Sequence, residues 1–70
     1  MTIKPGIYRH YKGNDYEVIG LARHSEDESQ LVVYRALYGE QGLWVRPLEM
    51  FSETVTVEGK VKLRFEYINT

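Results

Sequence analysis

Two histidines, His10 and His24, are the side chains in this sequence best suited to bind a metal or to transfer a proton near neutral pH. His24 is followed by Glu26 and Asp27, and imidazole together with carboxylate suits zinc, nickel or iron. The two histidines do not, however, follow an HxxxH or HxH spacing, and the acidic residues are typical of a solvated hairpin loop. We therefore expect no metal site and no cofactor.

The sequence His24-Ser25-Glu26 contains the three side-chain types of a hydrolase triad. Triad residues converge through the fold rather than along the chain, and neighbouring residues of a strand point to opposite faces. The sequence also has no glycine-rich nucleophile elbow and no phosphate-binding loop. We therefore expect no catalytic residues and a protein that is not an enzyme.

Aromatic and basic side chains remain as candidates for binding. Tyr and Trp combine an apolar body with a polar group, and Arg adds a planar donor group that stacks on rings, so these residue types dominate binding hot spots. A small protein without cysteine also needs aromatic side chains in its core, so part of this set should be structural. The predicted binding residues are Tyr8, Arg9, Tyr11, Arg23, Arg35, Trp44 and Arg46, and Lys12, Tyr34 and Tyr38 have the same chemistry.

Turn-forming sequences recur at short intervals between segments rich in Tyr, Val, Ile, Leu and Trp, a pattern typical of antiparallel strands. No helical periodicity extends beyond about two turns. Pro47 suits the first position of a single helical turn through Leu48, Glu49 and Met50. The predicted strands are Ile7–Tyr11, Asp15–His24, Gln30–Tyr38, Leu43–Arg46 and Leu63–Ile68, with a short strand near Thr54–Val57.

Gly20 lies inside the longest predicted strand, where glycine is costly unless the backbone bends or another segment approaches closely. A bulge at this position would let one strand serve two orthogonal sheets. The pattern therefore predicts an all-β fold, an SH3-like small barrel of about five strands with one short helical turn. An OB-like barrel is the alternative, although it would need a longer chain and a true helix.

The alternation of residues divides the central hairpin into two faces. Tyr34 lies on one face and Arg35 on the other, and the face of Arg35 should not be wholly buried because an unpaired arginine is expensive to bury. Trp44 and Arg46 share one face of the next strand. We interpret Val45 as facing the core, which leaves Trp44 partly exposed.

The composition predicts a single soluble domain spanning residues 1–70. The formal net charge is −1, which argues against a strong attraction to nucleic acid or to anionic membranes. No cysteine is present, so stability must come from apolar packing, to which six Tyr, two Phe and one Trp can contribute. No segment resembles a transmembrane helix or a signal peptide, so we expect a cytoplasmic protein without membrane contact.

The segments GIYRHYKGNDYEVIGLARHSEDE, LVVYRALYGEQGLWVRPLEMF and RFEYI resemble a bacterial family, domain of unknown function 1653. The resemblance covers nearly the whole chain and implies an SH3-like fold. It implies no activity, and therefore no catalytic or binding residues. Leu63 stands where members of the family often have proline, a departure that concerns only the start of the last strand.

These observations favour a non-catalytic binding or adaptor module that uses an aromatic and arginine-rich face to contact a protein partner or a second copy of itself. The alternative is binding of single-stranded nucleic acid, in which Tyr8, Tyr11 and Trp44 stack on bases and basic residues contact phosphates. A small metal protein or enzyme that uses His10 or His24 has the least support.

Overall fold

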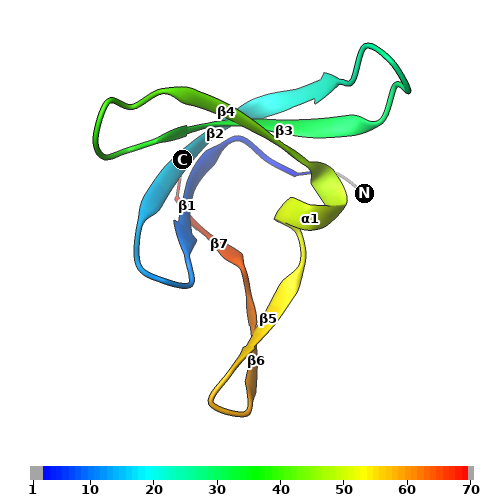
Figure 1. Cartoon of the computed structure of the whole chain (residues 1–70). Helices are drawn as coiled ribbons and strands as arrows, with labels where there is room; N and C mark the ends of the chain where they lie inside the picture. The colour runs from blue at the N-terminus through cyan, green and yellow to red at the C-terminus, as the bar shows by residue number, and fades with distance from the viewer. Residues whose placement is uncertain (1–2, 70) are drawn as a thin grey trace.

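The structure, a computed structural model, describes residues 3–69. Five of the strands in this range form one antiparallel sheet in the order β4-β3-β2-β1-β7, and β5 and β6 form a separate hairpin. Figure 1 shows that the large sheet curves around a short helix, α1, whereas the β5–β6 hairpin projects away from it. The elements are β1 (Gly6–His10), β2 (Asp15–Arg23), β3 (Gln30–Ala36), β4 (Leu43–Pro47), α1 (Leu48–Phe51), β5 (Thr54–Val57), β6 (Lys60–Leu63) and β7 (Phe65–Asn69).

The mostly β structure with one helical turn confirms the predicted fold class. The predicted strand ends lie within about two residues of the observed ends, but β6 was not predicted, because a short alternation of Lys with apolar residues also suits a solvated loop. Within residues 3–69, β4 and β7 are the edges of the large sheet and do not pair with each other. The closure into an SH3-like barrel is therefore not confirmed. No helix in this range is long and apolar enough to cross a membrane.

The two faces of the large sheet follow from its register. Tyr8 lies opposite Tyr16 across β1 and β2, and Val18 lies opposite Tyr34 across β2 and β3, so these residues share the concave inner face. Tyr8 also lies opposite Tyr67 of β7, near the other end of the described chain. The buried core on this face consists of Tyr8, Val18, Val32, Tyr34, Leu48, Phe51 and Phe65.

The helical turn α1 covers the inner face. It follows Pro47, as the sequence predicts, and its buried residues Leu48 and Phe51 are three apart and therefore lie on one side of the turn. The ring of Phe51 stacks on that of Phe65, with centroids 4.1 Å apart and an interplanar angle of 4°. The same Phe51 ring meets Tyr8 edge-on at 5.6 Å. These contacts join α1 to both β1 and β7.

Gly20 follows a bulge, but the structure does not require glycine there. Val18 lies opposite Tyr34 whereas Gly20 lies opposite Val33, so Ile19 is the extra residue and β2 does bend at this point. The backbone of Gly20 is not in the positive-φ region, and a Cβ added to it would meet no atom within 4 Å. The predicted bulge is therefore confirmed, whereas the alternative explanation of Gly20, a close approach of another segment, is wrong. Gly13, in the β1–β2 turn, does have a positive φ, of +107°.

His10 packs against aromatic rings at the end of β1. Its ring centroid lies 4.9 Å from that of Phe65, in an edge-on arrangement. Partial burial, followed by the nearby positive charges of Arg64, Lys12 and Arg46, lowers the pKa of His10 below its ordinary value of 6.5. The folded protein therefore favours the neutral imidazole.

Substitution of glycine should separate these two positions. Gly20→Ala should change the free energy of unfolding by less than about 1 kcal/mol, because the backbone and the surrounding space both accept a Cβ. Gly13→Ala should lower the free energy of unfolding by about 1–3 kcal/mol, because a residue with a Cβ is strained at this φ. Chemical denaturation of both variants measures the difference, and a Gly20→Ala variant as unstable as Gly13→Ala would contradict our interpretation of the bulge.

The pH dependence of folding should reveal the neutral state of His10. Because the pKa of His10 is lower in the folded protein than in the unfolded chain, protonation favours unfolding. The stability should be fully present above pH 6.5 and should fall as the pH drops from there towards the lowered pKa. Urea unfolding at about pH 7.5 and about pH 5.5 measures the free energy of unfolding at each pH. This free energy should fall less between the two pH values for His10→Asn than for the wild type. An equal loss in both proteins would assign the dependence to other groups.

Candidate functional site

The predicted binding residues do not form one surface. Tyr8 is only 6% exposed, and its hydroxyl donates a hydrogen bond to the carbonyl oxygen of Lys4 at 2.8 Å. It is therefore a core residue, and its assignment to a binding surface is wrong. Tyr11 lies just after β1, half-exposed, with its ring centroid 4.6 Å from that of His10.

The arginines are spread over different parts of the sheet. Arg9 lies on the outer face, where its Nε donates to Oδ1 of Asp15 at 2.8 Å. This hydrogen bond lowers the pKa of the Asp15 carboxyl below its ordinary range. Arg35 lies on the same outer face, opposite Glu17 of β2. Arg23, at the end of β2, contacts the Glu28 carboxylate at 3.3 Å. The predicted residues therefore do not gather on one face: Arg9 lines a hollow with Tyr11, whereas Arg23 and Arg35 lie elsewhere on the sheet.

Trp44 is exposed, as predicted, but for a different reason. It lies opposite Tyr34 and therefore points to the inner face, the side on which the core forms. The side chain remains 61% exposed because β4 is an edge strand and α1 follows its other end. Val45 points to the outer face and is 58% exposed, so the expectation that Val45 faces the core is wrong. Arg46 shares the inner face with Trp44, and its Cζ lies 5.7 Å from the centroid of the Phe65 ring.

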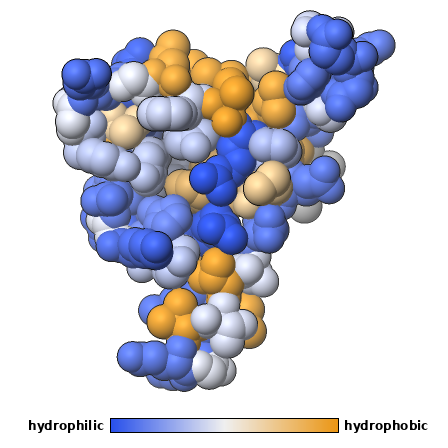
Figure 2. All heavy atoms as spheres, viewed as in Figure 1, coloured by the Kyte–Doolittle hydropathy of each residue, from blue (hydrophilic) through white to orange (hydrophobic). Residues whose placement is uncertain are grey.

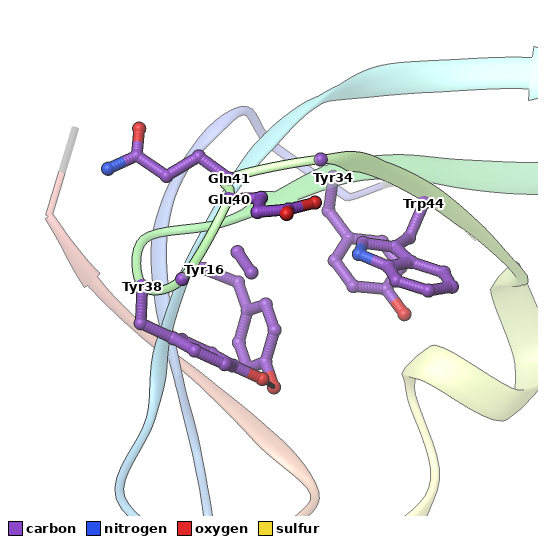
Figure 3. A pocket seen from close by; sticks show the side chains of 9 residues that line it. Tyr16, Tyr34, Tyr38, Glu40, Gln41 and Trp44 are labelled. Atoms are coloured by element: carbon purple, nitrogen blue, oxygen red, sulfur yellow. Dashed lines mark hydrogen bonds between the residues drawn. The ribbon is translucent and has the colours of Figure 1, made fainter.

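An open cleft of about 360 Å³ lies beside Trp44. We call it the aromatic cleft and define it by Tyr16, Tyr34, Tyr38 and Trp44. Figure 3 shows Tyr16 and Tyr38 together on one side and Tyr34 and Trp44 on the other. The short side chain of Ala36, which also lines the cleft, cannot fill the space between them. The cleft is therefore an extension of the core that remains open to solvent.

The tyrosine rings of the aromatic cleft have a defined arrangement. Tyr16 meets Tyr34 at 5.6 Å and 75°, and it meets Tyr38 at 5.7 Å and 77°. The hydroxyl groups of Tyr16 and Tyr38 are hydrogen bonded at 2.8 Å, which holds the Tyr38 ring although this residue lies beyond β3. Burial, followed by this hydrogen bond, raises the pKa of Tyr16 to about 12. The Tyr16 hydroxyl is therefore neutral at physiological pH.

The loop between β3 and β4 forms the rim of the aromatic cleft. Gly39 at φ 62° and Gln41 at φ 55° both have left-handed backbones, which reverse the chain direction in a short distance. Figure 3 shows the Glu40 carboxylate over the cleft, whereas the Gln41 side chain points away from it. Glu40 is the charged residue among those that line the aromatic cleft in the described part of the chain.

Tyr16 and Glu40 belong to the site although they were not predicted. Tyr16 lies opposite Ala36, and this register brings its ring next to Tyr34 and Tyr38. Its alternation with Val18 indicated only that the two side chains share a face. Glu40 lies in a turn-forming sequence, where a carboxylate is ordinarily interpreted as solvated. Its direction depends on the backbone of Gly39 and Gln41.

The two histidines lie in other hollows. His24 lines a hollow of about 450 Å³ with Asp27, and its Nδ1 lies 3.6 Å from the Asp27 carboxylate. His10 lines a hollow of about 420 Å³ with Arg9 and Glu66. Within residues 3–69, no three His, Asp or Glu side chains gather in a way that could hold a metal ion. The aromatic cleft contains the two most exposed aromatic side chains of the described residues, Trp44 and Tyr38, together with Glu40, and we take it as the candidate site.

The chain resembles known proteins in both sequence and fold. The family described as "Protein of unknown function (DUF1653)" matches residues 6–67. A crystal structure of a DUF1653 protein from Bordetella bronchiseptica is similar, with 40% sequence identity and a TM-score of 0.88 over 96% of this chain and 88% of that chain. No curated protein shows a significant match. Because the family matches most of the chain, the protein belongs to the DUF1653 family.

Proposed function

We propose that this protein is a non-catalytic binding module that accepts a segment of a partner protein in the aromatic cleft. The observation that carries the proposal is the open wall of aromatic rings, in which Trp44 is 61% and Tyr38 is 48% exposed. Leaving such rings in water forgoes the hydrophobic stabilisation that their burial would provide. Trp and Tyr in pockets are also the side chains that contribute most to protein interfaces.

The strand beside the cleft supports an extended partner segment. β4 is an edge of the large sheet, so one side of its backbone carries no strand partner within residues 3–69. Exposed edge strands are templates for pairing with another chain. Leu43 and Val45 of β4 are also exposed, at 60% and 58%. Figure 2 shows hydrophobic residues gathered along the upper border of the molecule, where Figure 1 places β4 and β3. A segment paired with β4 would place alternate side chains beside Trp44.

The polar groups of the cleft support binding rather than catalysis. The Tyr16 hydroxyl, with a pKa of about 12, is a poor base or nucleophile near neutral pH. His10 and His24 line other hollows, so neither is placed to activate a group in the aromatic cleft. A site about 360 Å³ in volume and open to water also gives little exclusion of solvent.

Binding of single-stranded nucleic acid has less support. The charged residue that lines the aromatic cleft is Glu40, whose carboxylate would repel a phosphate backbone. Arg9 and Arg23, two of the basic residues that such binding would use, are paired with Asp15 and Glu28. Arg46 lies on the same face of β4 as Trp44, but its guanidinium lies over Phe65, so a base stacked on Trp44 would meet few of the basic groups that such binding uses.

Substitution of Trp44 should separate binding from folding. Trp44→Ala should lose only about 1–2 kcal/mol of stability, less than the roughly 3–5 kcal/mol expected for a fully buried Trp. Peptides selected from a displayed random library against the wild type should bind Trp44→Ala at least about tenfold more weakly in fluorescence polarisation. Val61→Ala, at a similarly exposed position in the separate β5–β6 hairpin, is the matched control and should retain the peptides.

Two outcomes would contradict the proposal. One is that the selection yields no peptide whose binding depends on Trp44. The other is that the wild type, but not Trp44→Ala, forms a stable dimer in analytical ultracentrifugation at micromolar concentration. In that case a second copy of the chain, rather than a partner protein, occupies the cleft.

A further inference from the structure

We infer that the aromatic cleft selects a quaternary ammonium group, presented by the partner segment as the side chain of a trimethylated lysine. The inference rests on the proposed function and specifies the chemistry of the ligand. It follows from the nature of the walls of the cleft, from the charge at its rim and from its size.

The walls of the cleft are the faces and edges of aromatic rings. Tyr16 stands nearly perpendicular to both Tyr34 and Tyr38, at 75° and 77°, so the rings of the cleft present surfaces in more than one direction. The face of an aromatic ring carries partial negative charge and attracts a cation within about 6 Å of its centroid. Trp is the strongest such ring, and Trp44 stands at the open side of the cleft.

The rim adds a full negative charge. The Glu40 carboxylate extends over the cleft between the two pairs of rings (Figure 3). Lys and Arg are absent from the described residues that line the cleft. Arg46, on the same face of β4 as Trp44, has its guanidinium over Phe65 instead. The positive charge of Arg46 reaches Tyr16 and opposes a cation there, so the preference of the cleft for a cation comes from Glu40 and from the ring faces.

The polar groups of the cleft favour a methylated ammonium over an unmodified one. A primary ammonium is strongly hydrated and has three donors to satisfy, whereas trimethylation keeps the charge and removes the donors. The hydroxyl groups of Tyr16 and Tyr38 are hydrogen bonded to each other, and this bond uses one of their accepting lone pairs, so the ring walls offer few acceptors for three donors beside the Glu40 carboxylate. A cleft of about 360 Å³ has room for a single head group and part of its stem.

The test uses choline and its neutral carbon isostere, in which a tert-butyl group replaces the trimethylammonium group. The protein has one tryptophan, so the fluorescence of Trp44 reports directly on the cleft. We expect saturable binding of choline and at least about fivefold weaker binding of the isostere, because only the cation gains the attraction of the rings and of Glu40. Equal binding of the two, as expected for a cleft that accepts proline or another neutral group, would overturn the inference, as would no binding of either.

The role of the rim is tested by Glu40→Gln. This variant should bind choline about two- to fivefold more weakly, as expected for loss of an exposed ionic contact, and the loss should shrink at high salt. Glu58→Gln, which alters an exposed glutamate in the β5–β6 turn, away from the cleft, is the matched control and should bind choline like the wild type. Equal affinities of Glu40→Gln and the wild type would overturn the role of Glu40.

The source of the ammonium group is tested with two short Gly-Ser peptides that carry one lysine, either unmodified or trimethylated. The trimethylated peptide should bind more tightly than both the unmodified peptide and choline, because it adds contacts with the partner backbone. If the trimethylated peptide binds no more tightly than choline, the ligand is a free small molecule rather than the modified lysine of a partner protein, and the inference is wrong. If library peptides depend on Trp44 but choline does not bind, the proposed function stands and the inference about the cation fails.

Discussion

The stacking of Phe51 on Phe65 is the contact on which the architecture depends. It joins α1 to β7, and through Tyr8 it joins both to β1. A chain without cysteine has no covalent link to hold the curved sheet, so this aromatic group forms the centre of the core. The core is complete where α1 covers the inner face. Beyond the reach of α1 the same face stays open, and there the aromatic residues form a cleft.

The features that could be predicted from sequence are those that local chemistry determines. Turn residues and alternating apolar positions were sufficient for the main strands, and Pro47 marked the helical turn that follows β4. Alternation also indicated that Tyr34 and Arg35 point to different faces of the sheet, so that Tyr34 is buried and Arg35 is only partly buried. Closure of the sheet into a barrel depends on contacts between distant strands, which periodicity does not specify. Gly20 was misinterpreted because a glycine at a bulge suggests a steric requirement that the surrounding space does not impose.

The candidate site was only partly predictable, because it depends on register and on which edge remains uncovered. Alternation related Trp44 to Arg46 but could not show that both face the core side, since that follows from the pairing of Trp44 with Tyr34. The arginines were grouped by residue type, whereas the register divides them between the two faces and the strand ends. Tyr16 and Glu40 became part of the site only through strand pairing and loop geometry.

The pairing of β1 with β7 has a kinetic consequence. Tyr8 lies opposite Tyr67, so this pairing must close a loop that contains most of the chain, and loop closure of this kind slows folding. The four rings of the aromatic cleft come instead from β2, β3, β4 and the β3–β4 loop, which are consecutive in sequence. We expect these hairpins to associate early through local contacts and β7 to add late. The order of folding would then assemble the walls of the cleft before the core beside it is sealed.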